Sequence, residues 1–156
     1  MLAVLAERPA HPFAVARLLA EDGELGRILT VRRPLVYRAA ERLAAAGLCR
    51  PDHTEAGVGG PERTVYRATP AGRRALARWL TEPVDRVRDL RLEFLLKVRL
   101  TRRAGRSPLS LVQAQREALG PRLGALSSGG EGDEVALWRR HNARAAQTFL
   151  RDLEKR

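Results

Sequence analysis

The sequence predicts a mainly α-helical protein with one small β-hairpin, arranged as a winged helix-turn-helix followed by an α-helical dimerisation domain. Helical patterns, with apolar residues spaced by three and four, recur along most of the 156 residues. Two short extended runs, 48–54 and 63–69, flank a glycine-rich tip at 55–62, which indicates a hairpin. After Pro83 the pattern is purely helical. We therefore expect two domains, 1–82 and 83–156.

The first domain is expected to hold four helices around the hairpin. Proline near a first turn or glycine just past an end marks most of them, and they are expected at 2–7, 13–21, 33–46 and 70–82. Pro34 lies in the first turn of the third helix, where its missing N–H costs nothing, and Gly47 follows as a left-handed cap. Thr69 is expected to cap the fourth helix. This is the element order of a winged helix-turn-helix, but no N-terminal third strand is visible.

The second domain is expected to hold three helices, at 88–103, from 108 to about 120, and from 133 toward the C-terminus. The first is apolar on nearly every side, so more than one neighbour must bury it. Gly120-Pro121 is expected to kink or end the second helix, and residues 127–132 to form a loop. We expect two copies to pair through the residues Leu92, Leu95, Leu96, Val135, Trp138, Ala145, Phe149 and Leu153. Packing of these helices on their own winged helix, which would leave a monomer, is the alternative.

The charge favours a polyanionic partner. The net charge is +11, and residues 1–82 carry 13 basic and 9 acidic side chains while residues 83–156 carry 16 and 9. Arginine outnumbers lysine by 27 to 2. The planar guanidinium pairs bidentately with phosphate or guanine, although a GC-rich genome would produce the same bias.

The third helix is the candidate for a DNA-reading element. One arc holds the residues expected to pack inside, Leu35, Val36, Ala39, Ala40, Leu43 and Ala46. The opposite arc holds Tyr37, Arg38, Glu41 and Ala45, and residues 26–50 contain six arginines and one glutamate. A slim helix carrying such donors suits a major groove, and arginines of a hairpin suit the adjacent backbone or minor groove. A merely solvated basic face is the alternative. The expected contacts with double-stranded DNA are Arg32, Arg33, Tyr37, Arg38, Arg42, Arg63 and Arg67.

Three stretches resemble the PadR-like family of regulators. They are RPLVYRAAERLAAAGL at 33–48, VYRATPAGR at 65–73 and RDLRLEFLLK at 88–97, in the order of the family. The last helix, 138–153, is similar to the long C-terminal domain of one branch. The resemblance implies a homodimeric repressor that binds operator DNA and leaves room for a small-molecule effector. Two departures are Pro12, where a glycine commonly follows the histidine, and Gly120-Pro121, which interrupts a usually continuous helix.

Other functional classes fit the sequence less well. His11, His53 and His141 lie in three different segments and Cys49 is the single cysteine, so we expect no metal site and no internal disulfide. No base, nucleophile and orienting group occur together and no phosphate-binding loop is present, so neither an enzyme nor a cofactor is expected. The rival from another class is a winged-helix module for protein–protein interaction without operator binding.

Two single residues leave alternatives open. Cys49, next to Arg50, is either a small buried strand residue or a redox-sensitive thiol. Trp138 is either a core residue or the floor of an effector pocket, since aromatic planes stack on flat ligands.

The compartment is expected to be the cytoplasm, with no membrane partner. The apolar start at 1–6 lacks a basic leader and is cut off by Glu7-Arg8-Pro9, so it does not read as a signal peptide. No apolar run approaches the roughly 20 residues of a membrane span, and a single cysteine suits a reducing environment.

Overall fold

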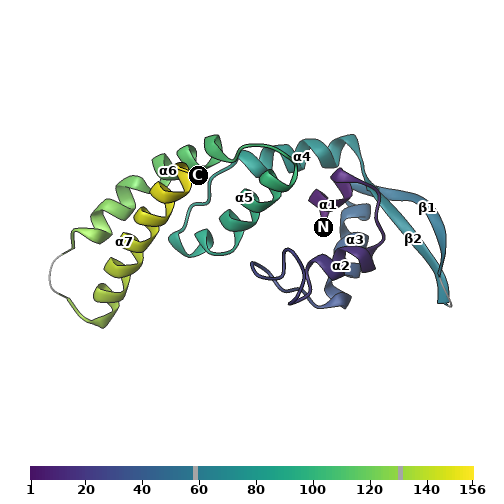
Figure 1. Ribbon diagram of the computed structural model, residues 1–156, viewed down its shortest axis with the longest axis horizontal. Helices are drawn as coiled ribbons and strands as arrows, with labels where there is room; N and C mark the ends of the chain where they lie inside the picture. Colours follow the sequence, from purple (N-terminus) through teal and green to yellow (C-terminus); the bar gives the residue numbers. More distant parts are fainter. Residues whose placement is uncertain (58–59, 130–131) are drawn as a thin grey trace. The chain divides into compact units, whose positions relative to one another are not determined.

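The computed structural model describes residues 1–57, 60–129 and 132–156 (Figure 1). These residues form two units, Met1–Trp79 and Leu80–Arg156. The elements of the first are α1 Leu2–Glu7, α2 Pro12–Leu18, α3 Arg33–Ala45, β1 Cys49–Gly57, β2 Gly60–Ala68 and most of α4 Pro70–Thr81. Those of the second are the short 3-10 helix η1 Val87–Leu90, α5 Glu93–Arg103, α6 Leu109–Ser127 and α7 Glu134–Glu154. The predicted fold class, helices with one hairpin, is confirmed.

The end of α2 lies earlier in the chain than the sequence predicted. The helix begins at Pro12, as expected, and the His11 Nδ1 accepts a hydrogen bond of 3.3 Å from the N–H of Ala14, so His11 is the N-cap. The helix ends at Leu18 because the chain then folds back on it: the N–H of Leu25 donates to the Leu18 carbonyl at 2.9 Å. A Cβ at Gly23 would lie 2.3 Å from the Arg17 carbonyl oxygen, so this fold-back requires glycine.

The hairpin pairs β1 with β2 in antiparallel register, from Cys49 opposite Ala68 to Gly57 opposite Gly60. Both strands reach further toward the tip than predicted, and residues 58 and 59 of the predicted tip lie outside the described residues. Within the described residues the sheet has two strands, and one isolated bridge joins the segment before α2 to β2. Ala10 and Tyr66 exchange two backbone hydrogen bonds of 3.0 Å each. A bridge of one residue has no alternating pattern, so the sequence could not reveal it.

The hairpin joins the helices around a small core of Leu5, Cys49 and Ala68, against which α1 and the C-terminal half of α3 pack. Thr69 does more than cap α4. Its hydroxyl oxygen accepts a hydrogen bond of 3.1 Å from the Gly72 N–H, and the hydroxyl donates to the Gly47 carbonyl at 2.7 Å. The start of α4 is thereby fastened to the end of α3.

The second unit encloses its own core between α5, α6 and α7. The fully buried side chains include Phe94, Leu119, Leu123 and Leu150, and the ring of Phe94 meets that of Phe149 edge to face at 6.4 Å between centroids. Neighbouring helices α6 and α7 run side by side (Figure 1). Burial by more than one neighbour, predicted for the first helix of this domain, holds for α5.

The sequence predicted that Gly120-Pro121 would kink or end a helix, and the predicted end is wrong, because α6 continues through Pro121 to Ser127. A proline normally disfavours the helical conformation of the preceding residue through that residue's Cβ, and Gly120 has none. Leu119 and Leu123 are both buried in the core, which anchors the helix on either side of the proline. A second difference is at 88–92, where η1 and a turn precede α5 instead of one continuous helix.

The segment after α4 is fixed to the second unit by two buried side chains. Gln115 of α6 is fully buried, and its side-chain oxygen accepts from the Val84 N–H at 2.7 Å while its nitrogen donates to the Val84 carbonyl at 2.9 Å. Lys97 of α5 is also buried; its Nζ donates to the Glu82 carbonyl at 2.7 Å and lies 2.9 Å from a Glu93 carboxylate oxygen. Residues 82–84 therefore form part of the packed unit.

Across the described ranges, every helix is too short or too polar to cross a lipid bilayer.

Candidate nucleic-acid interface

Helix α3 turns its polar face outward. Val36 and Ala40 are buried, whereas Arg33, Tyr37, Arg38, Glu41 and Arg42 are exposed. Gly47 ends the helix with φ +68°, and the N–H of Leu48 donates to the Leu43 carbonyl at 2.9 Å, as expected for a left-handed glycine cap. Local backbone bonds thus define the C-terminal end of the helix.

The inward arc of α3 is narrower than the sequence predicted. Leu35 is 50% exposed, and Ala46 is also exposed. Leu35 lies in the first turn, beyond the side of the helix that α2 and the hairpin cover. Its exposure adds an apolar side chain to the surface at this end of the helix.

The N-terminal end of α3 is the most basic part of the helix. Arg32 is the N-cap and Arg33 the first helical residue, and both are exposed. No side chain caps this end. The helix dipole adds positive potential to that of the arginines, which favours an anion at this end.

Phe13 links α3 to the hairpin, and the sequence did not single it out. The Cζ atom of Arg33 lies 4.6 Å from the centroid of the Phe13 ring, and the Cζ of Arg63 in β2 lies 5.6 Å from it. Two predicted DNA contacts from separate elements therefore meet on one aromatic ring. The only signal in the sequence would have been an aromatic residue in the first turn of the helix before the recognition helix.

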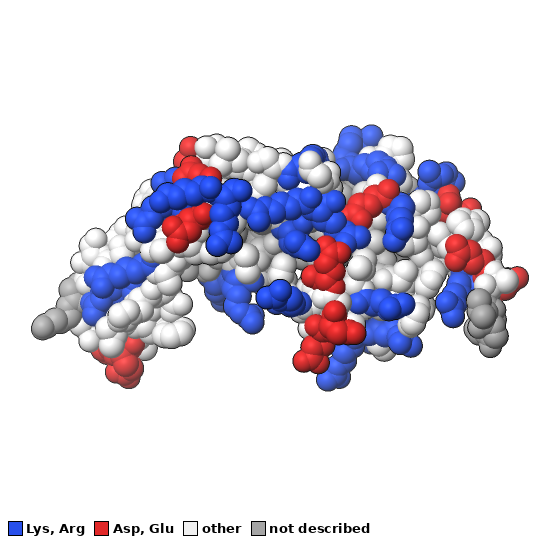
Figure 2. Space-filling view, viewed as in Figure 1, with Lys and Arg blue, Asp and Glu red and all other residues white. Residues whose placement is uncertain are grey.

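The hairpin is less basic than its arginines suggest. Arg67 lies 3.1 Å from a carboxylate oxygen of Asp52, so one predicted DNA contact is an ion-paired side chain in the free protein. The ring nitrogens of His53 lie 3.1 Å from Asp52 and 3.2 Å from Glu55. These hydrogen bonds, first to Asp52 and then to Glu55, raise the pKa of His53 above its ordinary value. Acidic side chains mix with basic ones at the hairpin end of the face in Figure 2.

The redox alternative for Cys49 is disfavoured by its surroundings. The thiol is buried, and Sγ lies 3.6 Å from the Ala40 carbonyl oxygen, to which it donates. Burial raises the pKa of Cys49, which disfavours the thiolate that oxidants attack. Among the residues that the structure describes, no group of three or more His, Cys, Asp or Glu side chains is placed to hold a metal ion.

The residues predicted for dimerisation do not share one environment. Phe149 and Leu153 pack against the core of their own unit, and Leu95 and Leu96 are partly buried. The exposed members are Leu92, Val135, Trp138 and Ala145, and Trp138 is 67% exposed. Leu137, which the sequence did not single out, is also exposed, at 45%. The large exposed apolar side chains of α7, Val135, Leu137 and Trp138, lie near its N-terminal end.

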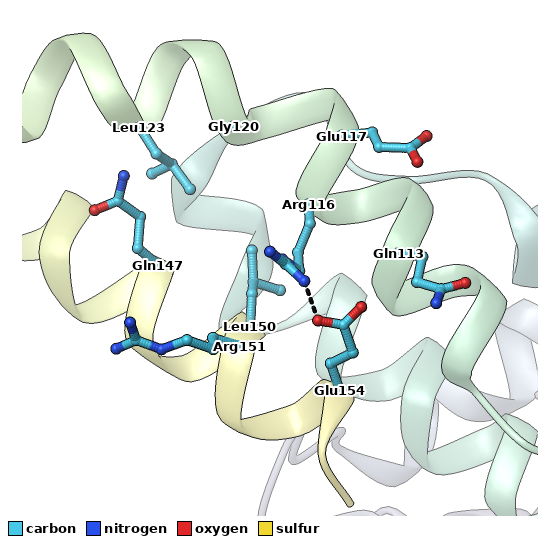
Figure 3. A pocket seen from close by; sticks show the side chains of 9 residues that line it. All are labelled: Gln113, Arg116, Glu117, Gly120, Leu123, Gln147, Leu150, Arg151 and Glu154. Atoms are coloured by element: carbon cyan, nitrogen blue, oxygen red, sulfur yellow. Dashed lines mark hydrogen bonds and ion pairs between the residues drawn. The ribbon is translucent and has the colours of Figure 1, made fainter.

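A polar groove runs between α6 and α7 (Figure 3). Arg116 of α6 forms an ion pair with Glu154 of α7 across it. The lining also includes Gln113, Glu117, Gly120, Leu123, Gln147, Leu150 and Arg151, and the hollow has a volume of about 720 Å³. Trp138 is not among these residues.

Comparisons with known proteins agree with the architecture. The family model described as "Transcriptional regulator PadR-like family" matches residues 1–78. The chain is similar to the crystal structure of Bacillus subtilis PadR in complex with operator DNA, with 16% sequence identity and a TM-score of 0.50 over 98% of this chain and 94% of that one. It is also similar to smu.1604c from Streptococcus mutans UA159, with 15% identity and a TM-score of 0.46 over 99% and 94% of the two chains. No curated protein matches.

Proposed function

This chain belongs to the PadR-like family of transcriptional regulators, and we propose that it is a homodimeric repressor that binds operator DNA through α3 and the hairpin. The observation that carries the proposal is the outward face of α3. Arg33, Tyr37 and Arg38 stand exposed in the first half of the helix, the half that usually meets base edges in this type of motif. Within the described part of the chain, Arg38 and Arg42 have no carboxylate partner, so both are available to DNA.

The two parts of the interface would have different tasks. Arg38 projects from α3, where a guanidinium can read the O6 and N7 atoms of guanine. Arg63 lies on the hairpin, where contact with phosphate is independent of sequence. Arg67 would have to exchange Asp52 for a phosphate, so we assign it a smaller contribution. The similar crystal structure of Bacillus subtilis PadR contains operator DNA, which supports a role of this fold in binding DNA here.

The test is a comparison of operator and random duplex DNA. The full-length protein would be mixed with a random-sequence library, the bound DNA recovered and sequenced, and its affinity measured over a range of salt concentrations. A repressor should enrich a two-fold symmetric sequence with half-sites about 34 Å apart or a multiple of that, and log affinity should fall steeply with log salt. An interaction module would bind no duplex even at low salt.

We propose that the second unit forms the dimer through the exposed apolar residues at the start of α7. Val135, Leu137 and Trp138 are each between 45% and 67% exposed. Large exposed apolar side chains so close in sequence are typical of a surface that a partner covers. A second copy of this chain would be the partner that covers these residues, because an operator with two half-sites requires two copies.

An effector would act on the second unit. The groove between α6 and α7 carries guanidinium groups of Arg116 and Arg151 and the amides of Gln113 and Gln147, donors that suit a small molecule with a negative charge. Such a ligand would compete with Glu154 for Arg116. Binding of candidate anions can be followed by isothermal titration, and the Arg116→Gln variant should lose it.

A further inference from the structure

We propose that Phe13 is a positioning residue for DNA binding: its ring holds Arg33 of the recognition helix and Arg63 of the hairpin together, so that both meet the same short stretch of DNA backbone. This inference rests on the proposed function, because the arrangement matters only if the protein binds DNA. It assigns a role to a residue that does not itself carry a charge.

Three elements meet at the ring. Phe13 lies in the first turn of α2, Arg33 is the first residue of α3, and Arg63 lies in β2. Their Cζ atoms are 4.6 Å and 5.6 Å from the ring centroid, so the two guanidinium carbons are at most 10.2 Å apart. Phosphates of one DNA strand follow one another about every 3.4 Å along the helix axis. A span of 10.2 Å covers about three such steps along the axis, so the two arginines can contact phosphates that lie a few steps apart on one strand.

The ring attracts both like-charged side chains to one place. The negative face of an aromatic ring favours a guanidinium group, and here two of them lie within 5.6 Å of the ring centroid. Carboxylates do not take this role. Glu41 and Glu62 line the same hollow, which has a volume of about 600 Å³, but within the described residues neither forms an ion pair with Arg33 or Arg63.

The ring is itself held in place. The imidazole of His11 stacks on Phe13 with 5.9 Å between centroids and planes 9° apart. His11 cannot turn freely, because its Nδ1 accepts the N-cap hydrogen bond from Ala14. A chain of contacts thus runs from the α2 N-cap through Phe13 to the two arginines. A long side chain that is already ordered loses less conformational entropy when it binds a phosphate.

The test is a mutant cycle in the full-length protein. Phe13→Leu keeps an apolar side chain but removes the ring, and Phe13→Trp restores a ring with a stronger attraction for cations. We expect Phe13→Leu to weaken binding to the recovered operator and to random duplex alike, by about five- to tenfold, and Phe13→Trp to bind as the wild type does. In a background carrying Arg33→Ala and Arg63→Ala, the Phe13→Leu effect should vanish.

A measurement without DNA separates positioning from folding. In the wild type, the ring current of Phe13 should shift the side-chain N–H proton signals of Arg33 and Arg63 upfield in NMR spectra. The shift should disappear in Phe13→Leu and return in Phe13→Trp, with the thermal midpoint of each variant recorded as a check on folding. A merely structural role for Phe13 would not predict this pattern.

Two outcomes would overturn the inference. If Phe13→Leu binds DNA as tightly as the wild type, the ring does not position the arginines. If its effect persists after both arginines are removed, the ring acts through another contact, such as a base or the packing of α2. Failure of the proposed function would look different, because the wild-type protein would then bind no duplex DNA at low salt.

Discussion

Replacement of Gln115 by leucine should test how strongly the segment after α4 is held. The amide of Gln115 makes two hydrogen bonds to the backbone of Val84, at 2.7 Å and 2.9 Å, and both residues are buried. Leucine has a similar volume but no donor or acceptor. Gln115→Leu therefore leaves one N–H and one carbonyl of Val84 without partners in a region that water does not reach.

The magnitude follows from these two groups. An unsatisfied buried polar group costs about 1–3 kcal/mol, and the added apolar surface of leucine recovers about 1 kcal/mol. We expect the free energy of unfolding to fall by about 1–5 kcal/mol. With an m-value in urea of about 2 kcal/mol/M, in the middle of the range for small proteins, the urea midpoint should fall by about 0.5–2.5 M. Protein concentration must be kept constant, because a dimer gains stability with concentration.

The neighbouring Gln113 provides a matched control, because it is exposed on the same helix. Gln113→Leu should change the unfolding free energy by no more than about 0.5 kcal/mol. A third variant, Gln115→Glu, buries a carboxyl group whose protonated form can both donate to and accept from Val84. Burial raises the pKa of such a carboxyl in the folded state, so its stability should increase as the pH falls toward the ordinary glutamate value of about 4.3. Equal stability of the two leucine variants would refute the reasoning.

Four further predictions concern single residues. Arg38→Ala should cost about 1–3 kcal/mol at the operator and less on random DNA; an equal loss in both titrations would make Arg38 a phosphate contact. Light scattering should give twice 17.3 kDa for the wild type and the mass of a folded monomer for Trp138→Glu; an unchanged mass in the variant would place the interface elsewhere. His53, with its raised folded pKa, should add stability below about pH 6.5 that is lost as the pH rises through that pKa, and urea midpoints should show this slope in the wild type but not in His53→Gln. Cys49 should react with an alkylating agent only as fast as the protein unfolds, and rapid labelling of the folded protein would contradict its burial.

The fold was predictable where local signals and hydrophobic pattern agree. Pro34 and Gly47 bracket α3 in the sequence, and the helix found spans Arg33–Ala45. The end of α2 was not predictable, because it depends on the hydrogen bond that Leu25 donates from a later turn. The continuation of α6 through Pro121 depends on the absence of a Cβ at Gly120 and on the core that holds both sides of it. Start and stop signals describe only the chain near them.

In the candidate site, too, some features could be predicted from the sequence and others could not. Exposure of Arg33, Tyr37 and Arg38 follows from the 3.6-residue period of α3, so the sequence could assign them to one face. Their contribution to DNA binding stays a prediction. The ion pair between Arg67 and Asp52 could not be predicted from helical periodicity, because it depends on the register of the hairpin. That register shifts at two places along β1 and β2.

Two features that the sequence could not reveal are single side chains that join segments far apart in the chain. The residues three and four positions from Gln115 in its helix are apolar, so the pattern gives no reason for a polar residue there. The reason is the two hydrogen bonds with the backbone of Val84. Phe13 likewise reads as an ordinary apolar residue until Arg33 and Arg63 are found over its ring. Periodicity reports which face of an element is buried, but it carries no information about the partner. A residue that joins two elements is therefore best sought where the pattern of its own element does not explain a buried polar group or an aromatic ring.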